Sequence, residues 1–292
     1  MPLVDAASLL RHAVRGGWAV GAFNCNNMEI LQAIIRAAEA EDAPVIVQAS
    51  QGAIKYAGLP YIAAMALDAA RTARVPVAVH LDHGTDFTQV MRCIRAGFTS
   101  VMIDGSHLSL EQNITLTRRV VEVAHAVGVS VEAELGRIGG TEDEISVEER
   151  EAFFTDPEEA AHFVRETRVD SLAVAVGTAH GRYRGEPRLD FPRLRRIRER
   201  VGIPLVLHGS SGVPADAIRE AVASGVAKVN IDTDIRQAFT GALRRALAEA
   251  PEEIDPRKVL APAREAATAV IREKIRLFGS AGRAKEVREV AP

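Results

Sequence analysis

The chain has 292 residues, of which 47% are hydrophobic and 26% are charged, as in an ordinary globular protein. The 36 Lys and Arg residues against 39 Asp and Glu residues give a net charge of −3, so we expect no nucleic-acid partner. Two cysteines, Cys25 and Cys93, exclude a disulfide framework and a cysteine-rich metal site. No apolar run approaches the roughly 20 residues that span a bilayer, and residues 1–17 lack the apolar centre of a signal peptide. We therefore expect a cytoplasmic protein without a membrane segment.

Short apolar runs rich in β-branched residues alternate with amphipathic segments from end to end. Runs of this kind are typical of parallel strands that are buried on both faces. They predict strands at 18–24, 43–50, 75–83, 98–104, 129–134, 171–177, 203–209 and 226–232. Apolar residues at helical spacing predict helices at 28–40, 111–127 and 189–201, with Asn26 or Asn27 as the N-cap of the first.

Eight strands with seven crossovers and a helical tail predict an α/β fold, a (βα)8 TIM barrel, as one domain over residues 1–292. The tail, 251–292, is expected to form a helical C-terminal extension. A doubly wound sheet is the main alternative, because a strand count does not prove closure. The polar segment 136–154 shows no core face, and we expect a long, mobile loop there.

Each predicted strand carries polar residues at its C-terminal end, which is where barrel enzymes place their chemistry. These residues are Asn24, Ser50, Asp82, His83, Asp104, Glu134, His180, His208, Asn230 and Asp232. A core has no use for them, since an unpaired buried polar group costs about 1–3 kcal/mol. The pattern therefore predicts a functional site at one end of the barrel.

Three of these residues, His83, His180 and His208, come from three different strands. Three protein ligands and an open position are the arrangement of catalytic zinc, although a single histidine of this kind is more often a core or surface residue. Asp82, beside His83, is placed to relay protons without binding the metal. Asp104 and Glu134 either support the ligating histidines, form a second metal position, or belong to buried ion pairs. His80, inside the third strand, is expected to be structural.

Two turns of small and polar residues predict a phosphate site. Gly209, Ser210 and Ser211 follow the seventh strand, and Asn230, Ile231, Asp232 and Thr233 follow the eighth. Loops in these positions bind phosphate in many barrels through backbone N–H groups and a helix N-terminus. Glu142, in the polar segment, is a solvated acid unless that segment folds over the site.

Seven motifs, in order, resemble the class II, metal-dependent fructose-bisphosphate aldolases, together with the related tagatose-bisphosphate aldolases. They are GAFNCNN, HLDHG, VMIDGS, EAELGRIGGTED, VGTAHGRY, LHGSSGVP and KVNIDTDIR, and the resemblance extends from Trp18 to Gly282. It implies a (βα)8 barrel that reversibly cleaves fructose 1,6-bisphosphate into dihydroxyacetone phosphate and glyceraldehyde 3-phosphate. The family uses Zn²⁺ to stabilise an enediolate, and the reaction belongs to glycolysis and gluconeogenesis.

The resemblance also implies roles for particular residues. The Zn²⁺ ligands match His83, His180 and His208, and Asp82 matches the acid/base at the carbon-4 hydroxyl. Asp104 and Glu134 match the positions for a second divalent ion, and Glu142 matches the acid that moves protons at carbon 1. The dihydroxyacetone phosphate site matches Gly181, Gly209, Ser210, Ser211, Asn230, Ile231, Asp232 and Thr233.

Further implied features concern the rest of the substrate and the assembly. Na⁺ or K⁺ is expected at carbonyls near Gly181, Gly209 and Ser211. Asn24 and Ser50 match residues that line the cleft, while Arg236 and Arg257 of a neighbouring subunit resemble the grips for the second phosphate. The expected assembly is a homodimer or a homotetramer.

Alternatives remain at this stage. The short stretch from Val213 to Ala223 is similar to that of tagatose-type members, whereas Asp232 favours fructose 1,6-bisphosphate as the substrate. Lys228 shares the parity of Asn230 and could form an imine, as in a Schiff-base aldolase. A metal-dependent hydrolase with a zinc hydroxide nucleophile, and a binding or assembly protein with a degenerate site, are the other two.

Overall fold

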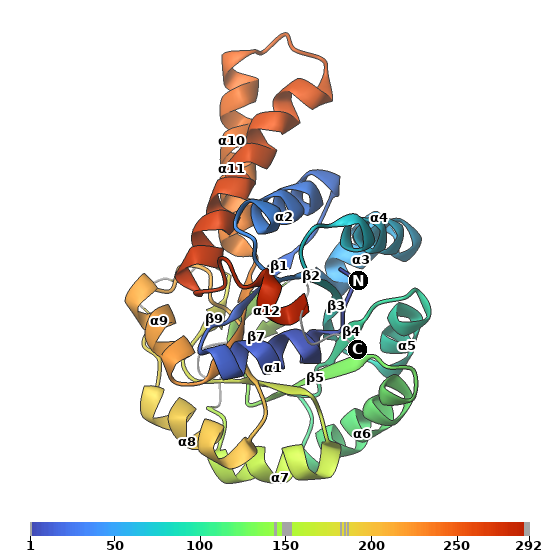
Figure 1. The fold of residues 1–292 in the computed structure, drawn as a ribbon, viewed down its shortest axis with the longest axis vertical. Coiled ribbons are helices and arrows are strands. Elements are labelled where there is room, and N and C mark those ends of the chain that lie inside the picture. The colour runs from blue at the N-terminus through green and yellow to red at the C-terminus, as the bar shows by residue number, and fades with distance from the viewer. Residues whose placement is uncertain are drawn as a thin grey trace.

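A closed barrel of eight parallel strands forms the centre of the protein, as the sequence predicts (Figure 1). The computed structural model describes residues 2–142, 145–147, 154–181, 183, 185 and 187–288, without the side chains of 140–142, 145–147 and 288. The strands follow the order β1-β11-β10-β8-β5-β4-β3-β2, so neighbours in sequence are mostly neighbours in space. Their bounds are β1 Val20–Asn24, β2 Val45–Ser50, β3 Val77–Gly84, β4 Ser100–Ile103, β5 Ser130–Leu135, β8 Ser171–Val174, β10 Leu205–Leu207 and β11 Val226–Ile231.

Helices surround the barrel on its outer face. They are α2 Met28–Ala40, α3 Gln51–Ala57, α4 Leu59–Thr72, α5 Phe87–Arg95, α6 Leu110–Ala126, α7 Pro157–Thr167, α8 Phe191–Val201, α9 Ala215–Ala223 and α10 Thr233–Glu249. Asn27, and not Asn26, caps α2 by accepting from the N–H of Ile30. Helix α8 begins at Phe191, two residues later than predicted, because the Asp190 side chain caps it.

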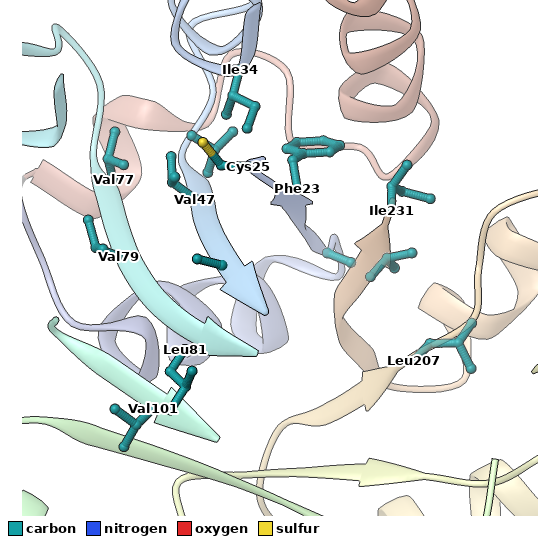
Figure 2. Close-up of a cluster of buried hydrophobic side chains, with 14 of the residues drawn as sticks. Phe23, Cys25, Ile34, Val47, Val77, Val79, Leu81, Val101, Leu207 and Ile231 are labelled. Carbon is teal, nitrogen blue, oxygen red and sulfur yellow. The ribbon is translucent and has the colours of Figure 1, made fainter. Parts of the chain in front are cut away.

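The main hydrophobic core lies between the strands and the outer helices (Figure 2). Alternate strand residues such as Phe23, Val47 and Val79 point outward and meet helix residues such as Ile34. A second, smaller core fills the N-terminal end of the barrel, where α1 (Ala6–Gly16) packs with Leu9 and other apolar side chains against the strands. The N-terminal end of the barrel is therefore closed by α1, which leaves the C-terminal end of the strands for a site.

The inward-facing residues change from apolar to polar toward the C-terminal ends of the strands. On β2 the inward column runs Ile46, Gln48, Ser50, and on β3 the residues paired with these are Ala78, His80 and Asp82. These six side chains are all buried. The inward side chains therefore fill the barrel interior with apolar groups near its N-terminal end and line a polar site near the C-terminal ends of the strands.

Segment 136–154 is not the plain loop that the sequence suggested. Strands β6 (Gly139–Glu142) and β7 (Ile145–Val147) pair antiparallel, and β6 also pairs in parallel with β9 (Ala179–His180). A polar segment without periodicity gives no strand signal, and the partner that supplies its hydrogen bonds lies about 40 residues away in sequence. The prediction that this segment is mobile falls in part outside the described residues.

Helix α10 and the first part of α11 (Pro256–Leu277) extend together away from the barrel (Figure 1). We call this pair the helical arm. Its base is tied to α2 by Glu41, whose carboxylate accepts hydrogen bonds from Arg272 and Arg276. Its far end exposes Ile254, which is 94% accessible. The chain then forms the short helix α12 (Ala284–Arg288) beside α1. No helix among the described residues is both apolar and long enough to traverse a lipid bilayer.

Candidate active site

Two consecutive residues at the end of β3, Asp82 and His83, both point into the barrel mouth. Neighbouring residues of a regular strand would face opposite sides. Here the register against β4 shifts between Leu81 and Gly84, and His83 adopts a left-handed backbone with φ of +48°. This bulge turns the His83 side chain into the barrel mouth. A left-handed backbone is unfavourable for a residue other than glycine, and such strained residues cluster at functional sites.

Gly84 makes the bulge possible. A Cβ atom at this position would lie 2.5 Å from the carbonyl oxygen of Met102. Strand β4 therefore approaches β3 too closely for any other residue without a backbone shift. The HLDHG motif thus combines two inward polar groups with the glycine that permits them.

The three predicted histidines meet at the mouth of the barrel. The ring centroid of His83 lies 5.1 Å from that of His180 and 4.6 Å from that of His208, and each ring can offer a nitrogen within 4.8 Å of the others. Nε2 of His83 lies 2.9 Å from Nδ1 of His208. The rings belong to β3, β9 and the residue after β10, so three separate segments bring them together.

In two of these rings, the nitrogen that faces away from the other histidines is hydrogen-bonded to a buried carboxylate. Nδ1 of His83 lies 2.9 Å from Asp104, and Nε2 of His208 lies 2.8 Å from Glu132. Burial lowers the pKa of His208 more than the hydrogen bond to Glu132 raises it, which favours the neutral imidazole. Although burial alone raises the pKa of Asp104, the hydrogen bonds from His83 and Ser106 bring it well below its usual value.

Asp104 and Glu134 form a second group with His83 whose ligand atoms also lie within 4.8 Å of one another. Both acids are buried, and Glu134 Oε2 lies 4.0 Å from Nδ1 of His83. The structure therefore brings these predicted residues together beside the three histidines. Their role as a second metal position stays a prediction.

Asp82 is completely buried and receives three amide hydrogen bonds. Oδ2 accepts from Asn24 at 2.8 Å and from Gln48 at 3.2 Å, while Oδ1 accepts from Asn230 at 3.2 Å. The donors come from β1, β2 and β11 and fix the orientation of the carboxylate. The other amide atom of Asn230, Oδ1, is buried and has no hydrogen-bond partner among the described residues. It is therefore an acceptor available to a bound hydroxyl.

A polar pocket lies next to the histidines. The residues around it are Asn24, His180, Gly181, Gly209, Ser210, Ser211, Asn230, Asp232, Thr233 and Arg236. Helix α10 begins at Thr233, so its N-terminal N–H groups and dipole face this region. The hydroxyl of Ser211 accepts from the backbone N–H groups of Asp232 and Asp234. Both small-residue turns therefore meet here, in a setting suited to an anion.

Gly209 and Tyr183 connect this pocket to the segment that carries His180. Gly209 has φ of +62°, and a Cβ atom there would lie 2.5 Å from the carbonyl oxygen of Ala179. The Tyr183 hydroxyl donates to the carbonyl of Gly209 at 2.7 Å and accepts from the N–H of Ala179 at 2.8 Å. Burial raises the pKa of this phenol to about 12. The contacts fix His180 relative to β10.

Four predicted residues have other surroundings. Ser50 is buried and caps α3 by accepting from the N–H of Ala53, and Ile231 packs its side chain into the outer core. Arg257 begins α11 on the helical arm, where it bonds to Asp255 with its side chain 89% exposed. Glu142 ends β6, and its side chain lies outside the described residues.

Sequence reasoning missed three residues of this site. Gln48, Glu132 and Tyr183 contact Asp82, His208 and Gly209 respectively. Alternation along VSVEAE gives Glu132 the parity of Glu134, so an inward carboxylate was available as a signal. Lys228 does face the interior, as its parity predicted, but it is ion-paired to Glu132 at 2.7 Å and has no exposed surface.

A closed barrel with three converging imidazoles and a polar pocket at the same mouth is the arrangement of a metal-dependent barrel enzyme. Residues 4–283 match the model of the family described as fructose-bisphosphate aldolase class-II. The chain is 50% identical to a fructose-bisphosphate aldolase of Thermus caldophilus, with 97% of this chain and 100% of that protein covered. A fructose-bisphosphate aldolase of Geobacillus stearothermophilus is 47% identical, covering 98% and 100%.

A solved structure agrees with the sequence relatives. The YdjI aldolase from Escherichia coli K12 superposes with a TM-score of 0.86 at 36% identity, covering 97% of this chain and 99% of that chain. The protein therefore belongs to the class II fructose-bisphosphate aldolase family.

Proposed function

We propose that this protein reversibly cleaves fructose 1,6-bisphosphate into dihydroxyacetone phosphate and glyceraldehyde 3-phosphate with the help of a divalent metal ion. The names of the two relatives at 47% and 50% identity support this substrate. The observation that carries the chemistry is the convergence of His83, His180 and His208 beside the polar pocket.

The donor set fits zinc. Two Zn–N bonds of about 2.0–2.1 Å at a tetrahedral angle separate their nitrogens by about 3.3 Å, so the 2.9 Å between His83 and His208 needs only a small adjustment. Neutral imidazoles leave the full charge on the ion. Bound there, Zn²⁺ would act as a Lewis acid that stabilises the negative charge left on the three-carbon ketone product when the carbon–carbon bond breaks. Asp104 and Glu134 would hold a second divalent ion, and carbonyls near Gly209 a Na⁺ or K⁺ ion.

Asp82 would take the proton of the carbon-4 hydroxyl, which starts cleavage. Its three amide donors hold the carboxylate in one orientation, so no reorganisation is needed when the substrate arrives. Asn230, beside both Asp82 and His208, would use its buried carbonyl oxygen to bind a substrate hydroxyl. Glu142, whose side chain lies outside the described residues, would exchange the proton at carbon 1.

Two sets of residues would bind the two phosphates. Gly181, the Gly209–Ser210–Ser211 turn and the N-terminus of α10 would bind the phosphate of the dihydroxyacetone half. Arg236, which already lines the pocket and bonds to Asp232, would bind the other phosphate together with Arg257 of the partner subunit. Asn24 and Ser50 would line the cleft between them.

Because Arg257 would act from a partner subunit, we expect a homodimer or a homotetramer. The helical arm extends beyond the barrel and carries Arg257 and the exposed Ile254 at its far end. An arm of this kind reaches a second subunit rather than its own site. The two cysteines are both buried and free, as is usual in a reducing compartment, and we propose that the enzyme works in the cytoplasm on a small-molecule substrate. We also propose that the chain is one domain, with residues 251–292 as its extension.

Chelation provides the first test of this proposal. We expect a chelator to abolish cleavage of fructose 1,6-bisphosphate and Zn²⁺ to restore it, and borohydride with substrate to leave no adduct on Lys228. Persistent activity in the metal-free protein would contradict the metal mechanism. Side-by-side turnover of the tagatose epimer tests the substrate, because the short stretch from Val213 to Ala223, which contains α9, is similar to that of tagatose-type members. Faster cleavage of the tagatose epimer would reverse the assignment.

A further inference from the structure

A cluster of ionisable groups lies inside the barrel, beneath the three histidines. Glu132 from β5 and Lys228 from β11 form an ion pair of 2.7 Å, and both are at most 2% exposed. Lys228 Nζ also lies 3.3 Å from Nε2 of His80, whose Nδ1 is 2.7 Å from the hydroxyl of Ser100. Desolvation makes such a pair expensive, and apolar residues of similar size would often be as stable. Stability alone therefore does not account for the cluster.

Glu132 joins this cluster to the site above. Its Oε2 is occupied by Lys228, and its Oε1 lies 2.8 Å from Nε2 of His208. A carboxylate paired with an ammonium group only accepts hydrogen bonds, so Nε2 of His208 must be the donor. The lone pair of His208 is then on Nδ1, the nitrogen that faces Nε2 of His83 at 2.9 Å.

We propose that Glu132 is a positioning residue that sets the tautomer and direction of His208 toward a divalent ion, and that Lys228 acts by holding Glu132 in place. The proposal rests on the metal site of the proposed function. Asp104 has the equivalent contact with His83, but it belongs to the second cluster of candidate ligands. Glu132 is not in that second group of candidate ligands, because it lies on the barrel side of the histidines and its Oε2 accepts from Lys228.

Glu132→Gln tests the tautomer directly. The new amide keeps the shape of the carboxylate, but it either turns its NH₂ group toward the Lys228 ammonium or donates to Nε2 of His208. The second arrangement moves the His208 proton to Nδ1 and removes the lone pair from the metal-facing side. We expect ¹⁵N NMR of histidine-labelled, metal-free protein at pH 8 to show protonated Nε2 in the wild type and a changed tautomer in the variant.

Zinc affinity, measured by competition with a chromophoric chelator, provides the second readout. We expect Glu132→Gln to weaken zinc binding about 10–100-fold, as the loss of a carboxylate behind a ligating histidine does. Glu41→Gln is the matched control, since it removes a mostly buried, ion-paired carboxylate far from His208 and should leave zinc affinity unchanged. If Glu132→Gln does not fold, the double variant Glu132→Leu with Lys228→Met replaces the pair by apolar groups and is judged by the same affinity criterion.

The outcomes separate the two claims. A wild-type tautomer together with wild-type zinc affinity in the variants would overturn the positioning role, and the cluster would then be only structural. Failure of the wild-type protein itself to bind zinc would overturn the proposed function and this inference with it. Weaker zinc binding with the changed tautomer supports both.

Discussion

Replacing Asp82 by asparagine is the sharpest test of the proposed chemistry, because it changes the proposed proton acceptor with almost no change in shape. Asp82 is 0% exposed and accepts from Asn24, Gln48 and Asn230. The new amide side chain would accept the bonds from Asn24 and Gln48 through its oxygen and turn its NH₂ group toward Asn230. One buried acceptor is then replaced by a donor that faces another donor.

The effects of this substitution on stability and on catalysis have different expected magnitudes. One lost buried hydrogen bond costs about 1–3 kcal/mol of stability. Loss of general acid–base catalysis lowers kcat by about 10²–10⁴-fold. We therefore expect Asp82→Asn to remain folded at 25 °C and to bind zinc, while cleavage falls by at least two orders of magnitude.

The assay couples triose phosphate formation to NADH oxidation, with zinc content measured on the same sample. Asp82→Ala serves as the second variant, since it removes the side chain without placing a new donor beside Asn230. The reasoning would be refuted if Asp82→Asn, fully loaded with zinc, cleaved fructose 1,6-bisphosphate at a rate near that of the wild type.

Three further predictions address the metal, the arm and the core. His180→Ala is expected to lose zinc and cleavage together, as metal analysis of the purified variant would show; retained zinc would remove His180 from the ligand set. The hydrogen bond from Arg276 lowers the pKa of Glu41, so this carboxylate stabilises the fold above its unfolded pKa of about 4.3, and the benefit disappears as the pH falls through the lower folded value. Urea unfolding should therefore find Glu41→Gln less stable than wild type at pH 7, with the difference shrinking in acid; an equal difference at all pH values would contradict this. Phe23→Ala should cost about 3–5 kcal/mol in urea unfolding, whereas Tyr61→Ala, at a position 74% exposed, should change stability by less than about 0.5 kcal/mol.

The barrel was predictable because its signal is local. Apolar β-branched runs, each followed by an amphipathic segment, define parallel strands and crossovers without knowledge of any distant contact. The same locality explains the failures. Segment 136–154 pairs as β6 with β9, and no periodic pattern within it indicates that partner.

The polar residues of the site were predictable by type and only partly by arrangement. Position at a strand end singled out Asp82, His83 and His208, since a packed core would not retain such groups. Their common direction depends on the β3 bulge, which the sequence shows only as a single glycine, Gly84. Strand alternation alone would have turned one of the two neighbours away from the site.

The sequence by itself thus determined the barrel, the end of the barrel that carries polar groups, and the family. Only the tertiary structure decided how these groups act on one another: that Asp82 is held by three amides, and that Lys228 is paired with Glu132 and not free to react. Secondary structure follows from spacing along the chain, whereas hydrogen-bond partners and tautomers follow from distances between strands that only closure of the barrel sets.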